Sequence, residues 1–363
     1  MASFLALFCI AMCISSSLAW QSPWEKLTTN ANPVPNVGAH EAVAVNWKIY
    51  VFGGLTENRT LDWPEAWTSM PNVLRVFDTV TNQWSVPTTT GPVPPGRAWF
   101  AMSAIGSTLY VYGGQGFDPV NPFGDFYSFD TLTNTWTNLT KEGGSEIYPV
   151  PAQGPALVQR QGKLYLFGGY GSNDLWEYTP STNSWRVMET TNGIKPSVRA
   201  LPELKVWQNS LMLFGGEAWD DSIGYLAYKQ DMWEYDFGSK SWRQRVPVQA
   251  LARRRLHYAS IIVGNQWHFH GGDYGSCADL DLLVPTTMLY DLRDDQWRDG
   301  YLPFYAEGPV IKRAKFTQVG FKVYMTGGYG GIKCSNSQQE FNNDMWTYDP
   351  TNMFVPLSIA FQN

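Results

Sequence analysis

Apolar and aromatic residues recur along the chain in short runs, and six of these runs end at a pair of glycines. The runs are too short for helices and are separated by polar turns, so they predict β-strands. The six pairs begin at Gly53, Gly113, Gly168, Gly215, Gly271 and Gly327. Successive pairs are 60, 55, 47, 56 and 56 residues apart, which indicates one structural unit repeated six times.

A second strand, a polar turn and a tryptophan follow each glycine pair. In the first copy, Val76-Phe77-Asp78 precedes Trp84, and the turn between them is Thr79-Val80-Thr81-Asn82. This turn chemistry is typical of a hairpin between antiparallel strands. The sixth copy has Phe354 at the place of the tryptophan, whereas the other five have Trp84, Trp136, Trp185, Trp242 and Trp297.

The repeat resembles the Kelch motif, and the chain is similar to a six-bladed Kelch β-propeller from about residue 20 to residue 363. The resemblance implies an all-β fold of antiparallel four-stranded blades. A blade cannot cover both of its own faces, so blades stack around an axis and bury large aromatics between them. Glycine is expected at each pair because the backbone there turns with dihedral angles that a side chain would not allow.

Two segments compete to complete the last blade. Trp24-Glu25-Lys26-Leu27 resembles the start of an outer strand, and so does Phe354-Val355-Pro356-Leu357. The sequence leaves open whether the N-terminal or the C-terminal strand closes the ring.

Residues 1–19 have the features of a cleavable signal peptide. They contain no charged side chain, are apolar from Phe4 to Ile14, and end in Ser17-Leu18-Ala19. The apolar run of about 11 residues is shorter than the roughly 20 needed to span a bilayer. We therefore expect cleavage before Trp20, secretion, and no stable membrane insertion of the domain at 20–363.

The expected compartment determines how cysteines and glycosylation triplets are interpreted. Cys277 and Cys334 follow the fifth and sixth glycine pairs in equivalent loops of adjacent blades. An even pair of cysteines in an oxidising compartment favours a disulfide between them. Asn58-Arg59-Thr60 and Asn138-Leu139-Thr140 are acceptor triplets, so glycosylation is expected at Asn58 and Asn138.

Composition excludes several classes of protein. With 44% hydrophobic, 15% aromatic and 16% charged residues, the chain is neither disordered, collagenous nor a coiled coil. A formal charge of −6 argues against nucleic acid as a partner. We find no glycine-rich phosphate loop, zinc cysteine cluster or nucleophile elbow, and we predict no cofactor.

Resemblance to Kelch ligand-binding domains implies that the positions 16 and 14 residues before each glycine pair line a central funnel. Arginines there would accept an acidic peptide, a carboxylate or an anionic sugar. The alternative is that these arginines are structural and bond carbonyls between blades. The candidate ligand-binding residues are Arg97, Trp99, Arg199, Arg255, His257 and Arg313.

Metal sites receive less support. Glu217, Asp221 and Tyr225 resemble the Glu-x3-Asp-x3-His iron motif of plant specifier proteins, which are also Kelch propellers, but tyrosine replaces the histidine. His268 and His270 occupy positions that hold aromatic residues in other repeats, which favours packing. A Kelch copper oxidase needs a cysteine-modified tyrosine, and both remaining cysteines are assigned to the expected disulfide. No metal is therefore predicted.

The sequence favours a secreted binding or adhesion protein that recognises an extracellular protein or glycan through the funnel and the loops after the glycine pairs. The alternative is an extracellular enzyme on the same scaffold, either a metal-dependent oxidase or lyase or a metal-free sugar isomerase. Fold alone does not choose between them. The oligomeric state is not determined by the sequence.

Overall fold

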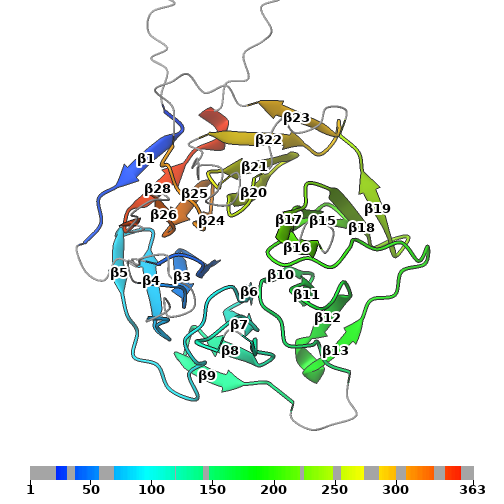
Figure 1. Ribbon diagram of the computed structural model, residues 1–363. Helices are drawn as coiled ribbons and strands as arrows, with labels where there is room; N and C mark the ends of the chain where they lie inside the picture. Colours follow the sequence, from blue (N-terminus) through cyan, green and yellow to red (C-terminus); the bar gives the residue numbers. More distant parts are fainter. Residues whose placement is uncertain are drawn as a thin grey trace, which may run out of the picture.

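The computed structural model describes residues 22–30, 37–56, 69–118, 120–141, 147–220, 225–247, 255–273, 286–299, 308–330 and 340–352. These residues form β-strands and two short 3₁₀ helices, η1 (Pro180–Thr182) and η3 (Pro350–Asn352). The strands are arranged as blades around a central axis (Figure 1). Within the described ranges, no helix has the length and apolar character that a membrane span requires.

Six four-stranded antiparallel sheets follow one another around the ring, which confirms the predicted architecture. Blade 1 consists of β2 (Glu41–Val45), β3 (Lys48–Phe52), β4 (Leu74–Asp78) and β5 (Gln83–Ser85). Blade 2 consists of β6 (Ala101–Ile105), β7 (Thr108–Tyr112), β8 (Phe126–Asp130) and β9 (Thr135–Asn138). Blade 3 consists of β10 (Pro155–Arg160), β11 (Lys163–Gly168), β12 (Leu175–Thr179) and β13 (Ser184–Val187).

The remaining blades complete the circle and carry two extra hairpins. Blade 4 consists of β14 (Glu203–Trp207), β15 (Ser210–Phe214), β18 (Met232–Asp236) and β19 (Ser241–Arg245). Blade 5 consists of β20 (Ala259–Val263), β21 (Gln266–His270), β22 (Thr287–Asp291) and β23 (Gln296–Asp299). Blade 6 consists of β24 (Lys315–Val319), β25 (Lys322–Thr326), β28 (Met345–Tyr348) and β1 (Trp24–Leu27). The extra hairpins are β16 (Glu217–Asp220) with β17 (Tyr225–Tyr228), and β26 (Tyr329–Gly330) with β27 (Glu340–Phe341).

The N-terminal strand closes the ring. β1 pairs antiparallel with β28 and places Trp24 opposite Tyr348. The repeat tryptophans of the other blades have the same kind of partner, for example Trp136 opposite Phe129. Trp24 therefore fills in blade 6 the place that the sequence comparison assigned to Phe354, which lies outside the described residues.

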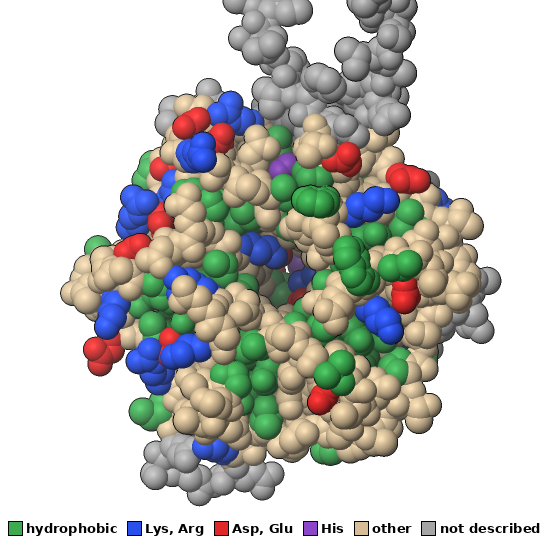
Figure 2. Space-filling model, turned by 180° about the vertical axis from the view of Figure 1, so that it is seen from behind, with side chains coloured by type: hydrophobic (Ala, Val, Ile, Leu, Met, Phe, Trp, Pro, Cys, Tyr) green, Lys and Arg blue, Asp and Glu red, His purple; other side chains and the backbone are tan. Residues whose placement is uncertain are grey.

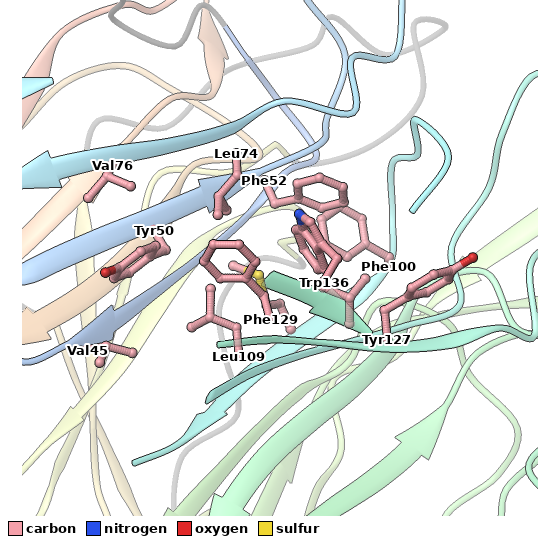
Figure 3. Close-up of a cluster of buried hydrophobic side chains, with 12 residues drawn as sticks. Val45, Tyr50, Phe52, Leu74, Val76, Phe100, Leu109, Tyr127, Phe129 and Trp136 are labelled. Carbon is pink, nitrogen blue, oxygen red and sulfur yellow. The ribbon is translucent and has the colours of Figure 1, made fainter. Parts of the chain in front are cut away.

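The core lies between blades. Phe52, directly before the first glycine pair, packs against Trp136 of the next blade with ring centroids 5.2 Å apart, and Figure 3 shows both rings in one buried cluster. Offset aromatic pairs of this kind stabilise a fold beyond the area they bury. The same contact recurs in the pairs Tyr112–Trp185, Phe167–Trp242, Phe214–Trp297 and His270–Trp24.

The glycine pairs link neighbouring blades. Gly53 and Gly54 have φ values of 63° and 88°, in the left-handed region. The N–H of Gly54 donates to the carbonyl of Arg97 in the next blade over 2.8 Å, and a Cβ on Gly53 would lie 2.6 Å from the same oxygen. Glycine is therefore required both by the backbone conformation and by the close approach of the next blade.

Candidate functional site

A cavity of about 180 Å³ lies on the axis, lined by the first strand of every blade. Figure 2 shows the hollow at the centre of the ring, with charged side chains visible in it. At one end, the residues just before these strands form the opening next to the glycine pairs, which we call the mouth. Trp99, His257 and Arg313 line the cavity, whereas Arg97, Arg199 and Arg255 do not.

A ring of backbone hydrogen bonds shapes the mouth. Trp99, Leu201, His257 and Arg313 have φ values between 52° and 60°, although none is glycine. The N–H of Trp99 donates to the carbonyl of Ala39, and that of Arg313 donates to the carbonyl of His257, so each link joins adjacent blades. Bulky residues keep positive φ only where the surrounding structure imposes it, and such strain concentrates at functional sites. The ring fixes the side chains at the mouth.

Arg97 and Arg199 have the contacts that the structural alternative expects. Both side chains are fully buried. Arg97 forms two parallel hydrogen bonds to the Asp125 carboxylate, over 2.6 and 2.8 Å, and also donates to the carbonyl of Gly113. Arg199 bonds Asp231 in the same way, over 2.7 and 2.8 Å. Each arginine ties the strand before one glycine pair to the strand after it.

Arg255 occupies the same position in blade 5 but has a neutral partner. Its guanidinium donates to the carbonyl and hydroxyl oxygens of Thr286, over 2.9 and 2.6 Å. Thr286 stands where Asp125 and Asp231 stand in blades 2 and 4, because all three carbonyls accept from the first glycine of their pair. The charged clamp of blades 2 and 4 is thus replaced by a neutral one.

Arg313, His257 and Trp99 form a connected group at the mouth. The Arg313 guanidinium lies 5.4 Å from the centre of the Trp99 ring, and its Nη2 is 3.2 Å from His257 Nε2. Because a guanidinium only donates, His257 Nε2 is the acceptor and its proton is on Nδ1. Burial, helped by Arg313, lowers the pKa of His257, in agreement with a neutral ring.

His257 continues the group to two further charges. Its Nδ1 donates to Asp273 Oδ2 over 3.2 Å, and Lys312 Nζ donates to the same oxygen over 2.8 Å. Burial by itself would raise the pKa of Asp273, but His257 and Lys312 outweigh it and hold it far below its usual range. Asp273 stays ionised and holds the imidazole in one orientation.

On the opposite side of the mouth, the Tyr170 hydroxyl donates to Glu217 Oε1 over 2.8 Å. Burial, with Glu217 next, raises the pKa of Tyr170 well above its ordinary value. Glu217 is the first of the weak iron candidates. Tyr225 lies opposite Asp220 in the β16–β17 hairpin, and Asp221 lies outside the described residues. No cluster of three or more metal-ligating side chains occurs in the described part of the chain.

Below the mouth, the cavity holds ion pairs that the sequence did not reveal. Lys315 Nζ lies 2.7 Å from Glu41, and Lys205 Nζ lies 2.9 Å from Glu203. Burial raises the pKa of Glu41, whereas Lys205 and Lys315 outweigh burial and lower that of Glu203. The two pairs come from blades distant in sequence, so no spacing rule could have brought them together.

The other histidines are packed in the core. His268 is hydrogen-bonded to the Tyr348 hydroxyl over 2.8 Å. His270 bonds Thr287 through Nδ1 and the Pro309 carbonyl through Nε2, and it stacks on Trp24. His40 bonds the Thr326 hydroxyl through Nε2. Burial lowers the pKa of His268 to about 4 and those of His40 and His270 to about 3.

Several predicted features lie outside the described residues: the signal peptide at 1–19, Asn58, Cys277 and Cys334. Asn138 is described, and it lies exposed at the end of β9. Its Oδ1 accepts a hydrogen bond from the N–H of Thr140 over 2.8 Å.

A family model described as the KLHDC2/KLHL20/DRC7 Kelch-repeats domain matches residues 39–272 and, in an overlapping match, 146–328. Host cell factor 2 of Homo sapiens is 24% identical over 93% of this chain and 45% of its own length. Host cell factor of Drosophila melanogaster is 23% identical over 93% of this chain and 24% of its own length. Host cell factor 1 of Homo sapiens is 24% identical over 90% of this chain and 17% of its own length. The chain therefore spans less than half the length of these curated relatives.

Proposed function

The chain belongs to the KLHDC2/KLHL20/DRC7 Kelch-repeats domain family, and on this premise we propose that it is a secreted binding or adhesion protein whose mouth recognises an extracellular protein or glycan. The observation that carries the proposal is the connected group at the mouth. Arg313, His257 and Trp99 face the cavity, and the ring of backbone hydrogen bonds holds them in place. Preorganised polar and aromatic groups around a concave opening are the usual makings of a binding site.

A protein segment is the partner that these groups favour, since Kelch propellers typically bind proteins. The described mouth carries both signs of charge, from Arg313 and Lys312 and from Glu217 and Asp273. Such a site discriminates between partners by where it places each charge rather than by attracting all anions. The tryptophan offers an apolar contact beside the arginine.

The test is a display screen of secreted-protein fragments and a glycan array, both probed with residues 20–363. Arg313→Ala and Trp99→Ala are expected to weaken binding to a selected ligand about tenfold or more. The matched control is Arg293→Ala, which removes an exposed arginine from the β22–β23 turn, away from the mouth. Unchanged affinity of both mouth variants would exclude the mouth as the site.

Secretion is part of the proposal and is supported by the sequence of residues 1–19. In a secreting host we expect the mature protein in the medium to begin at Trp20. We also expect sugar on Asn58 and Asn138, of which Asn138 is exposed. N-terminal sequencing and the mass change on enzymatic deglycosylation test these points, with Asn138→Gln as the control for one of the two sites.

A disulfide between Cys277 and Cys334 is proposed for the same compartment. Its support is that the two loops begin side by side: Lys312 bonds Asp273, at the start of one loop, and lies 5.7 Å from the ring of Tyr329, at the start of the other. Closing a loop of this length would contribute on the order of 4 kcal/mol in the chain-entropy model. Peptide mapping with and without reduction tests the pairing.

An enzyme on the same scaffold is the second candidate, and the pairs His257–Asp273 and Tyr170–Glu217 favour it. A neutral histidine oriented by a carboxylate can accept a proton, and a tyrosine across the opening can donate one. This is the minimum that a metal-free sugar isomerase needs. If this candidate is right, His257→Gln abolishes turnover of a sugar-acid panel while the protein remains folded. Equal turnover of the variant and the wild type would remove it.

A further inference from the structure

The six hairpins that join the first and second strands of the blades provide an internal comparison. Each has a two-residue turn, at the end of the ring opposite the mouth. The second turn residue is small or polar in blades 2 to 5, as tight hairpins favour. It is aromatic in blades 1 and 6, so the six residues in blade order are Trp47, Ser107, Gly162, Asn209, Asn265 and Phe321.

Neither aromatic residue serves the core. Trp47 is 61% exposed and Phe321 is 100% exposed. Blades 1 and 6 are neighbours across the closure, where Lys315 pairs with Glu41 and Thr317 bonds the carbonyl of Ala42. We call Trp47 and Phe321 together the aromatic platform.

The aromatic platform is built on fixed backbone. The Trp47 ring reaches the turn of blade 6, because its Cζ3 lies 3.3 Å from where a Cβ on Gly320 would be. The Trp47 carbonyl accepts hydrogen bonds from the N–H and the hydroxyl of Thr79, over 2.9 and 2.7 Å. The Gly320 carbonyl accepts one from Gln318 Nε2 over 3.1 Å. The two rings are thus held at adjacent turns.

We infer that the aromatic platform binds a neutral oligosaccharide of pyranose sugars. The C–H bonds on one face of a pyranose ring carry partial positive charge, which the negative face of an aromatic ring attracts. Lys48 and Lys322, each following its turn, are exposed and provide donors for sugar hydroxyls. Stacking surface next to hydrogen-bond donors matches the two faces of a sugar: apolar on one side, hydroxylated at the edge.

Charge and size argue against other occupants. Lys48 lies opposite Asp78 in the sheet and helps to lower the pKa of that carboxyl, so this end of blade 1 has no surplus of cations to attract an anionic membrane. Two aromatic side chains present a few hundred Å² at most, well short of the roughly 1,200 Å² of a stable protein interface. That area does suit contact with one or two sugar rings.

The aromatic platform is independent of the mouth. Ala39 at the mouth and Trp47 at the turn lie at the two ends of β2, eight residues apart, which is about 25 Å of extended chain. A ligand at one end does not touch the other. The protein would therefore hold a sugar chain and a protein segment at opposite ends of its axis.

The experiment is calorimetric titration of residues 20–363 with the β-1,4-linked hexasaccharides of glucose, N-acetylglucosamine, xylose and mannose. At least one is expected to bind, with Trp47→Ser weakening the affinity about tenfold or more and Phe321→Ser weakening it less. The matched control is Trp219→Ser, because Trp219 is 60% exposed but lies in β16 near the mouth. It should leave the affinity within about twofold of the wild type.

Three results would overturn the inference. The first is that no hexasaccharide binds. The second is that Trp47→Ser binds as tightly as the wild type. The third is that the protein sediments with phosphatidylcholine–phosphatidylserine vesicles through Trp47 while binding no sugar. Thermal unfolding of both serine variants is a folding control, since removing exposed rings should leave the midpoint nearly unchanged.

Discussion

Arg97 and Arg313 differ by two positions in the repeat register and by everything in their surroundings. Arg97 is fully buried, and every contact it makes belongs to its own blade, Asp125 above all. Arg313 faces the axial cavity and bonds His257 of the neighbouring blade. One arginine builds the frame and the other lines its opening, so the position in the register, rather than the residue type, separates architecture from candidate site.

The same comparison can be made within the structural position alone. Arg199 repeats the charged clamp of Arg97, whereas Arg255 has the neutral Thr286 as its partner. A charge-assisted bidentate pair is stronger than hydrogen bonds to neutral oxygens. Blade 5 is therefore held less firmly at this point than blades 2 and 4.

The largest effect is expected from breaking the buried clamp. Arg97→Ala leaves Asp125 and the Gly113 carbonyl without their donor, and we expect a loss of about 3 kcal/mol in the free energy of unfolding. Denaturant unfolding measures it. The double variant Arg97→Ala/Asp125→Ala should lose less than the sum of the two single variants, because the charges act as a pair. A loss below about 1 kcal/mol would show that the clamp is not structural.

The buried histidines predict a fall in stability on acidification. Their folded-state pKa values are lowered to about 3 for His40 and His270 and about 4 for His268. The unfolded chain, with a pKa near 6.5, therefore binds protons first as the pH falls. Stability is complete above pH 6.5 and is lost below it, by on the order of 2 kcal/mol per histidine at pH 5.

His270→Phe isolates one of these contributions, because phenylalanine or tyrosine fills the same place in blades 1 to 4. The slope of unfolding free energy against pH between 6 and 5 should decrease by about one proton. An unchanged slope in denaturant titrations at these two pH values would mean that His270 does not stay neutral.

A smaller effect is expected at the neutral clamp. Arg255→Ala should lower the free energy of unfolding by about 1 to 2 kcal/mol, less than Arg97→Ala, because no carboxylate is left unpaired. Thr286→Asp gives blade 5 the partner of blades 2 and 4 and should raise stability by up to about 1 kcal/mol. If the two arginine variants are equally destabilised in parallel denaturant titrations, the charged partner is not what distinguishes them.

The smallest effect on folding is expected at the mouth. Arg313→Ala removes contacts to the Trp99 ring and His257 and should change the free energy of unfolding by less than about 1 kcal/mol. The same variant should lose ligand, as proposed above. A loss as large as that of Arg97→Ala would return Arg313 to the frame and remove the contrast on which the candidate site depends.

Local patterns were enough to predict the blades. The glycine pairs, the aromatic strands before them and the spaced tryptophans repeat because each blade solves the same packing problem, and a repeated problem leaves a repeated signal. Gly54 and Phe52 are readable from sequence for this reason: one needs positive φ and the other fills the gap between blades.

What the sequence determined by itself was therefore the repeat, the strand order and the residue positions near the axis. Only the tertiary structure decided that Trp24 completes blade 6, that Arg97 is bound to Asp125 while Arg313 faces the cavity, and that Glu41 meets Lys315 across 274 residues of chain. These outcomes depend on closure of the ring. Closure brings together residues with no fixed spacing, and no periodicity along the chain records which side chains then meet.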